Sequence, residues 1–169
     1  MKPGGFSLLD DSEYPSALVA PQYSYISGYN DISYLELSKI MQEKGISINQ
    51  QILAYSDSIN GTVKTSEFET LMQIIYLMFT KPNFTENSWN QISVALENNS
   101  KTLEVNPTNA FMAEMKKVLY DGDIRKNLGT SELISQIDKD IAERIYKEKF
   151  TDASNYTLIL VGDFLENKI

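Results

Sequence analysis

The sequence contains no cysteine and no histidine among its 169 residues. Without cysteine the chain can form no disulfide, no thiolate nucleophile and no cysteine-ligated zinc or iron–sulfur site. Without histidine it has no imidazole base, no serine-type triad in the usual form and no ordinary catalytic zinc site. The chemistry open to the chain is therefore that of carboxylates, hydroxyls, lysines and two arginines.

Long apolar runs and positive charge are also scarce. No run approaches the ~18 consecutive apolar residues of a membrane-spanning helix, and residues 1–5 lack the apolar region of a signal peptide. The 15 basic and 23 acidic residues give a net charge of −8, which repels phosphates and anionic lipid headgroups. We therefore expect no nucleic-acid partner and no membrane insertion.

The length and the composition, with 42% hydrophobic residues, are those of one globular domain. Apolar spacing predicts helices over much of the chain and only a few strands. The expected segments are helices at 14–26 and about 34–44, strands at 47–54 and 57–64, several helices between 66 and 150, and a buried strand at 156–161. Runs of helices beside a small sheet indicate an α+β fold.

Several of these helices carry recognisable signals at their ends. Ser66 followed by Glu69 has the spacing of a capping box. The other predicted caps have side chains that accept hydrogen bonds from the first turn of a helix, and they are Thr85, Asn106, Thr130 and Asp138.

Acidic residues supply the only candidates for metal or acid–base chemistry. Asp121, Asp123 and Glu132 are spaced like the oxygens of a calcium loop, but Lys126 stands where such a loop needs glycine. We therefore interpret residues 121–123 as the turn that ends a helix. Two carboxylate pairs, Glu67/Glu69 and Glu143/Glu148, could serve as acid and base, although helix capping and a solvated helix face explain them more simply.

Tyrosines are concentrated near the start of the chain, at positions 14, 23, 25, 29 and 34. Tyrosine suits wet interfaces because it buries a ring while its hydroxyl stays solvated. Core packing explains most such residues, but a stacking surface for a peptide or a sugar stays open as a hypothesis.

One stretch carries a more specific signal. Residues 66–82, SEFETLMQIIYLMFTKP, resemble the helix that reads DFETLLQLIYLYFTAPRF in the pitrilysin/insulinase family of zinc peptidases. Further similarities occur on both sides of this stretch, in the order in which the family has them. They are PGGFSL (3–8), ISGYNDIS (26–33), LENN (96–99), NP (106–107), VLYDGD (118–123), IYKEKFTDASNYT (145–157) and LVGDF (160–164). The resemblance covers nearly the whole chain and rests on the order and spacing of many short motifs.

The resemblance implies a fold and a domain organisation. These peptidases consist of paired homologous halves that face each other like a clamshell, each half a two-layer arrangement of helices on an antiparallel sheet. We therefore expect a single non-catalytic half-domain over residues 1–169, truncated at both ends. Residues 1–13 would be an N-terminal arm or strand remnant, 14–164 the core, and 165–169 the truncated end.

The resemblance also locates the positions where the zinc ligands would stand. Only one half of such a peptidase carries the inverted motif His-x-x-Glu-His, with a further glutamate ligand downstream. The two histidine positions fall on Val19 and Tyr23, the general base on Gln22, and the distal ligand on Asn99 or its neighbour Asn98. An apolar side chain, a phenol and amides cannot bind Zn²⁺ tightly or ionise its water. The expectation is a chain with no catalytic residue and no metal, zinc belonging to the catalytic half of the parent protein.

The function implied is that of a catalytically inactive half of a bacterial zinc metallopeptidase, periplasmic or in the cell envelope. It would close the chamber and assist peptide binding, with the catalytic half as partner on the same or another chain. The family's Arg and Tyr that contact substrate would lie beyond residue 169, so substrate-binding residues are not assigned. Exposed strand edges would favour self-association of the fragment. The main alternative is a stand-alone peptide- or protein-binding module, and a less favoured one is an enzyme that uses carboxylates alone.

Overall fold

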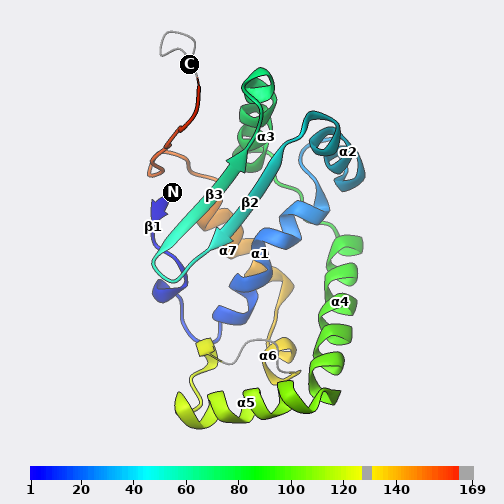
Figure 1. The fold of residues 1–169 in the computed structure, drawn as a ribbon, viewed down its shortest axis with the longest axis vertical. Coiled ribbons are helices and arrows are strands. Elements are labelled where there is room, and N and C mark those ends of the chain that lie inside the picture. The colour runs from blue at the N-terminus through cyan, green and yellow to red at the C-terminus, as the bar shows by residue number, and fades with distance from the viewer. Residues whose placement is uncertain (127–130, 164–169) are drawn as a thin grey trace.

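A computed structural model describes residues 1–126 and 131–163. This part of the chain contains seven α-helices and a small antiparallel sheet, and α1 and α7 lie behind the β2–β3 hairpin in the view of Figure 1. The helices are α1 (Tyr14–Ser27), α2 (Tyr34–Lys44), α3 (Phe68–Thr80), α4 (Glu86–Val105), α5 (Pro107–Leu119), α6 (Ser131–Ser135) and α7 (Lys139–Phe150). The strands are β1 (Lys2–Pro3), β2 (Ser47–Ile52) and β3 (Ser56–Thr62). The predicted α+β class is confirmed, whereas the boundary at 164 and the segment 165–169 lie outside the described residues.

The sheet has the strand order β1-β3-β2. β2 and β3 form an antiparallel hairpin whose register runs from Ser47 opposite Thr62 to Ile52 opposite Asp57. β1 is only two residues long and pairs with the beginning of β3. Among the described residues, the outer edge of β2 and most of the β1-side edge of β3 therefore have no strand beside them.

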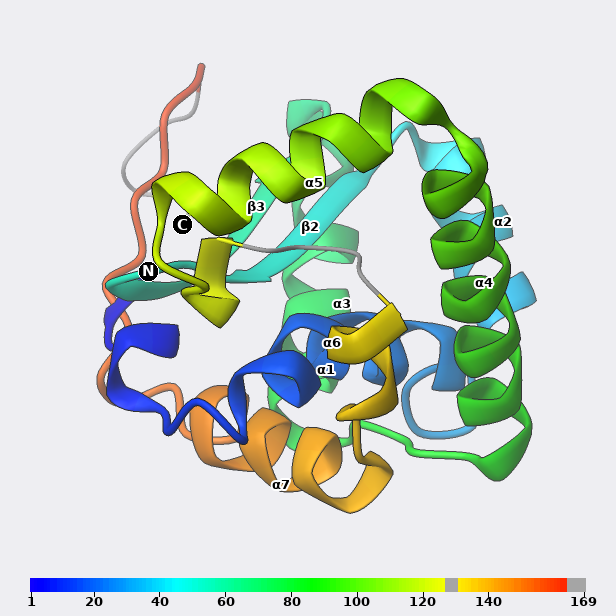
Figure 2. The same cartoon turned by 90° about the horizontal axis from the view of Figure 1, so that it is seen from below.

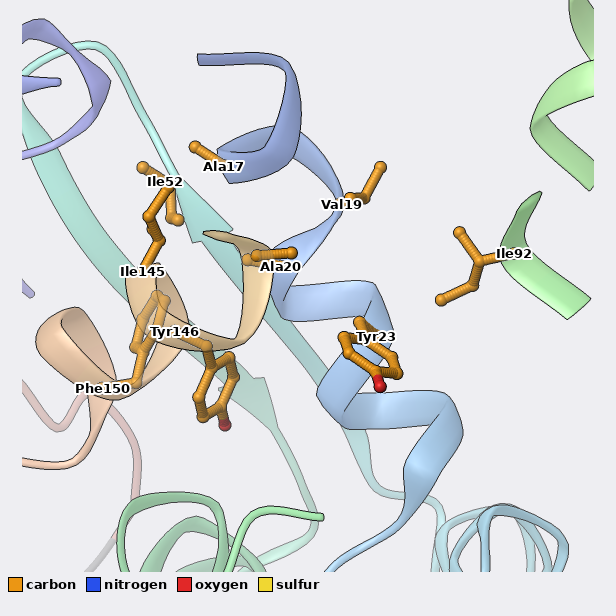
Figure 3. Packing of buried hydrophobic residues seen from close by; sticks show 10 residues of the cluster. Ala17, Val19, Ala20, Tyr23, Ile52, Ile92, Ile145, Tyr146 and Phe150 are labelled. Atoms are coloured by element: carbon orange, nitrogen blue, oxygen red, sulfur yellow. The ribbon is translucent and has the colours of Figure 1, made fainter. Parts of the chain in front are cut away.

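α1 is the central helix of the larger core. It contacts α7, β2, α4 and α2, and Figure 2 shows it between the sheet and α7. The buried side chains of this core come from α1, β2, α4 and α7 (Figure 3) and are Ala17, Val19, Ala20, Tyr23, Ile52, Ile92, Ala142, Ile145, Tyr146 and Phe150. A smaller core joins α2, α3 and the residues before β2, through Tyr29, Leu37, Met41, Ile46, Leu71, Ile74 and Met78.

Most of the predicted helix ends are confirmed. Thr85, Asn106 and Asp138 each accept a hydrogen bond from a first-turn N–H. The predicted cap Thr130 lies outside the described residues. Gly45 ends α2 in the left-handed conformation at φ 64°, which an L side chain rarely adopts. None of the helices in the described ranges is both long and apolar enough to cross a bilayer.

The capping box predicted at Ser66 and Glu69 is wrong. A 3₁₀ turn at Thr65–Glu67 precedes α3, which begins at Phe68 without a side-chain cap. Glu67, the residue just before α3, forms an ion pair with Lys44 at the end of α2. A capping box is found at Ser33 and Glu36 of α2.

The buried strand predicted at 156–161 is also wrong. In this segment only Thr157 makes strand-like hydrogen bonds, to the backbone of Met1. The residues after it run along the molecule without strand pairing (Figure 1). Leu158, Ile159 and Val161 are exposed. The residues are apolar enough for a strand, but no neighbouring backbone in the described chain completes the sheet around them.

Candidate functional site

Val19 and Tyr23, the two histidine-equivalent positions, lie one turn apart on the same face of α1. Both are buried, and they share the larger core with Ile92 of α4 (Figure 3). Gln22, the position of the general base, is exposed on α1. The helix therefore brings Val19 and Tyr23 together and turns Gln22 away from the core.

Asn98 and Asn99, the candidate positions of the distal ligand, are exposed on α4. Ile92 of α4 is buried in the core with Val19 and Tyr23, and Trp89 and Leu96 of the same helix pack against it, whereas neither asparagine belongs to this cluster. The core that holds the two histidine-equivalent positions thus does not include either asparagine.

The chemistry of these side chains does not fit zinc. Val19 has no lone pair, and burial raises the pKa of the Tyr23 phenol, so it stays protonated at neutral pH. The Tyr23 ring packs edge-on against Phe84 and Trp89, with centroids 5.2 and 5.1 Å away. In the described ranges, no three His, Cys, Asp or Glu side chains gather as metal ligands would. The two histidine-equivalent positions, Val19 and Tyr23, are therefore filled by side chains that pack against other aromatic and aliphatic groups.

The carboxylates considered as acid–base pairs each have a separate partner. Glu143 binds Lys147 at 2.6 Å and Glu148 binds Arg144 at 2.9 Å, both along one face of α7. Glu67 pairs with Lys44, which lowers the pKa of this carboxyl, and Glu69 accepts from Gln73. These carboxylates stabilise helices and their contacts.

The turn at residues 121–123 ends α5, as predicted. Gly122, at φ 73°, donates its N–H to the carbonyl of Lys117. Asp123 accepts from the backbone N–H of Arg125. The Arg125 guanidinium reaches back to the N-terminal arm, where it donates to the carbonyls of Phe6 and Leu9. Sequence reasoning missed this anchoring role, because nothing local links Arg125 to residues more than a hundred positions away.

A groove of about 450 Å³ lies between α1 and β2. Its walls are Leu18, Pro21, Gln22 and Tyr25 of α1, consecutive residues 48–53, and Ala17, Tyr29 and Met78. Because successive residues of a strand point to opposite faces of a sheet, a groove that touches all of them runs along the edge of the strand. This edge of β2 is the one without a neighbouring strand among the described residues.

The hydrogen-bond pattern shows which backbone groups line this edge. Leu53 donates to Ser56 at the hairpin turn, and hydrogen-bonded pairs alternate with non-hydrogen-bonded pairs along an antiparallel ladder. The N–H and C=O groups of Ile48, Gln50 and Ile52 therefore point away from β3, toward the groove. They can pair with an extended peptide.

Buried polar groups lie beside the groove. Gln50 donates to the Tyr146 hydroxyl at 3.2 Å, which donates to the Met78 carbonyl at 3.1 Å. Among the described residues, Ser24 Oγ, Tyr29 Oη and Gln50 Oε1 are buried without a hydrogen-bond partner. Sequence reasoning missed this cluster, and its one local signal is a glutamine at an inward-facing position of β2.

The tyrosine-rich opening belongs mainly to the core. Tyr14, Tyr23 and Tyr29 are buried, whereas Tyr25 lines the groove and packs edge-on against the partly exposed Tyr34. Of these five tyrosines, Tyr25 and Tyr34 are therefore the two that could contribute to a stacking surface.

The sequence matches no family model and no curated protein. The structure is similar over 99% of this chain to 18% of the periplasmic protease PqqL from Escherichia coli, with a TM-score of 0.76 and 20% identity. It is also similar, over 88% of this chain, to 16% of the ferredoxin protease FusC, whose structure contains Arabidopsis ferredoxin, with a TM-score of 0.66 and 17% identity. The chain thus spans less than a fifth of either protease. At the level of the fold the predicted resemblance is confirmed: this chain has the α+β fold found in proteases of the pitrilysin/insulinase type.

Proposed function

We propose that this chain is a catalytically inactive half of a bacterial zinc metallopeptidase that closes one wall of the chamber and holds substrate peptide. The observation that carries the proposal is the groove between α1 and the unpaired edge of β2. Pairing to a strand edge binds a peptide mainly through its backbone, which suits a protein that receives many sequences.

Several further features support a role in binding rather than in chemistry. The side chains at the positions that hold the general base and the zinc ligands in the family offer no metal site. These residues are Val19, Gln22, Tyr23 and Asn99. Zinc and the catalytic groups would then be supplied by a partner half. PqqL is a periplasmic protease, which supports a periplasmic or cell-envelope location.

A stand-alone peptide-binding module is the second candidate, and the same groove favours it. The two functions differ in what binding accomplishes. An inactive half acts on peptides only together with a half that carries His-x-x-Glu-His, whereas a stand-alone module binds peptides without any proteolytic partner.

Peptide binding can be tested with a fluorescein-labelled unstructured decapeptide that alternates valine and lysine, because the chain carries a net charge of −8. We expect saturable binding by fluorescence anisotropy, and protection of the Ile48, Gln50 and Ile52 amides from hydrogen exchange. Methylating two backbone nitrogens that face β2 removes two hydrogen bonds of about 1 kcal/mol each, so the affinity should fall about thirtyfold.

The control peptide carries the same two methyl groups on the nitrogens that face away from β2, and it should bind nearly as well as the parent peptide. Equal losses for both methylated peptides, or amide protection elsewhere in the chain, would show that the edge of β2 is not the binding site.

A further inference from the structure

The polar cluster beside the groove has a fixed direction of hydrogen bonding. The Tyr146 hydroxyl donates its proton to the Met78 carbonyl at 3.1 Å, so toward Gln50 it can act only as an acceptor. The amide nitrogen of Gln50, 3.2 Å away, therefore donates to it. This contact orients the Gln50 carboxamide, and it leaves the amide oxygen, Oε1, buried without a hydrogen-bond partner among the described residues.

Two hydroxyl groups of the same cluster, those of Ser24 and Tyr29, are also buried without a hydrogen-bond partner in the part of the chain that the structure describes. These two residues are 0% and 1% exposed. Burial raises the pKa of the Tyr29 phenol, so at neutral pH it keeps its proton and can donate it. Burial also raises the pKa of Tyr146, and the two hydroxyls and Gln50 beside it partly offset this rise. The cluster therefore offers an unused acceptor next to unused donors.

The groove between α1 and β2 extends to this cluster. Gln50, Tyr29 and Met78 all line the groove. Because Tyr29 and Met78 are almost completely buried, they mark its deep end. None of the described side chains that line the groove is charged. An ionised peptide side chain that entered the deep end would lose its hydration without gaining an opposite charge, so a neutral polar side chain suits this end better.

The position of Gln50 on β2 indicates how long that side chain should be. Gln50 faces inward from the strand, and its own carboxamide reaches the cluster. When a peptide pairs antiparallel to β2, the residue opposite Gln50 projects its side chain on the same face of the sheet, with the two Cβ atoms about 5 Å apart. A glutamine at this peptide position places a second carboxamide beside the first at the same depth, as in the amide ladders between stacked strands.

We infer, on the basis of the proposed peptide binding, that the groove selects peptides with a glutamine opposite Gln50. The amide nitrogen of the peptide glutamine donates to Gln50 Oε1, and its amide oxygen accepts from the Tyr29 hydroxyl. Ser24 Oγ can accept the second N–H of the same amide. Backbone pairing alone does not distinguish one side chain from another, whereas these contacts favour a carboxamide over an apolar side chain of similar length.

Two labelled decapeptides test this preference by fluorescence anisotropy. Both are the alternating valine and lysine peptide with one central valine replaced, by glutamine in one and by methionine in the other, because these side chains are uncharged and similar in length. We expect the glutamine peptide to bind about fivefold more tightly, since only glutamine supplies partners for the buried polar groups. Equal affinities, with the Ile48, Gln50 and Ile52 amides still protected from exchange, would overturn this inference alone. Binding of neither peptide would overturn the proposed function as well.

Variants of the chain show whether the cluster causes the preference. Gln50→Met removes the carboxamide and should make the two peptides bind equally. Tyr29→Phe removes a hydroxyl that has no partner among the described residues, so it should keep the circular dichroism spectrum and reduce the preference to about twofold. Gln91→Met, at an exposed site of α4, is the matched control and should retain the full preference. An undiminished preference in Gln50→Met, or in Tyr29→Phe if Gln50→Met does not fold, overturns the inference.

Discussion

Lys149 and Asp57 form a buried ion pair between α7 and the central strand β3. The Lys149 ammonium donates to the Gly5 carbonyl at 3.0 Å and lies 3.5 Å from Asp57 Oδ2. Asp57 is fully buried, and its other oxygen has no hydrogen-bond partner among the described residues. Lys149 therefore compensates the carboxylate and also fixes the N-terminal arm.

Lys149→Met should lower the free energy of unfolding by about 3 kcal/mol, because it leaves a buried carboxylate without its cation. Urea denaturation followed by circular dichroism measures the change. Adding Asp57→Asn to this variant removes the uncompensated charge and should restore part of the loss. Lys147→Met, on the exposed face of the same helix, is the control and should cost about 0.5 kcal/mol or less; a similar cost for both single variants would contradict the prediction.

The packing of α1 on α7 is reinforced at the start of α1 by an ion pair. Glu13 binds Arg144 at 2.5 Å and also accepts from the backbone N–H of Asp10. The hydrogen bond from Arg144 holds the pKa of Glu13 below its ordinary value of 4.5. A carboxyl whose pKa is lower in the folded state than in the unfolded state stabilises the folded protein. This stabilisation is complete at pH values above the pKa of the unfolded state, and it is lost as the pH falls through the pKa of the folded state.

Glu13→Gln should therefore lower the stability at pH 7 by about 0.5 kcal/mol, the range of a partly exposed ion pair. The difference between the parent chain and the variant should shrink as the pH falls below about 4.5. Thermal unfolding of both proteins between pH 7 and pH 3 measures this convergence. Glu97→Gln, in an exposed pair with Lys101 at 3.9 Å, should change stability less at pH 7; a constant difference for Glu13→Gln at all pH values would refute the assignment.

At the level of elements, local signals predicted the helices better than the sheet. The caps at Thr85, Asn106 and Asp138 depend on neighbouring residues, and they were predictable from sequence. Ser66 and Glu69 have the same spacing as Ser33 and Glu36, but Ser66 lies in a 3₁₀ turn and α3 begins after it without a side-chain cap. The segment 156–161 reads as a strand because its residues are apolar, whereas strand formation also requires a neighbouring edge.

At the level of the whole molecule, the order of short motifs predicted the fold, and the absence of histidine ruled out the usual zinc ligands. The groove could not be predicted in the same way. It depends on which edge of β2 stays unpaired and on how α1 lies beside it. Both are long-range properties, since the sequence pattern shows that residues 47–54 alternate but not which strand will lie next to them.

In the proposed function this chain binds peptide and a second half carries the catalytic zinc, which predicts how the chain behaves alone and with that partner. After dialysis against buffer free of chelator, elemental analysis should find zinc well below one ion per chain, because Val19 and Tyr23 offer no metal-binding nitrogen. The chain alone should not cleave an unfolded fluorogenic casein. Joined to a half that carries His-x-x-Glu-His, it should raise cleavage above that of this half alone, and changing the motif's glutamate to glutamine should abolish it. Stoichiometric zinc in the isolated chain would contradict the inactive role, and no gain on joining the halves would favour the stand-alone binding module.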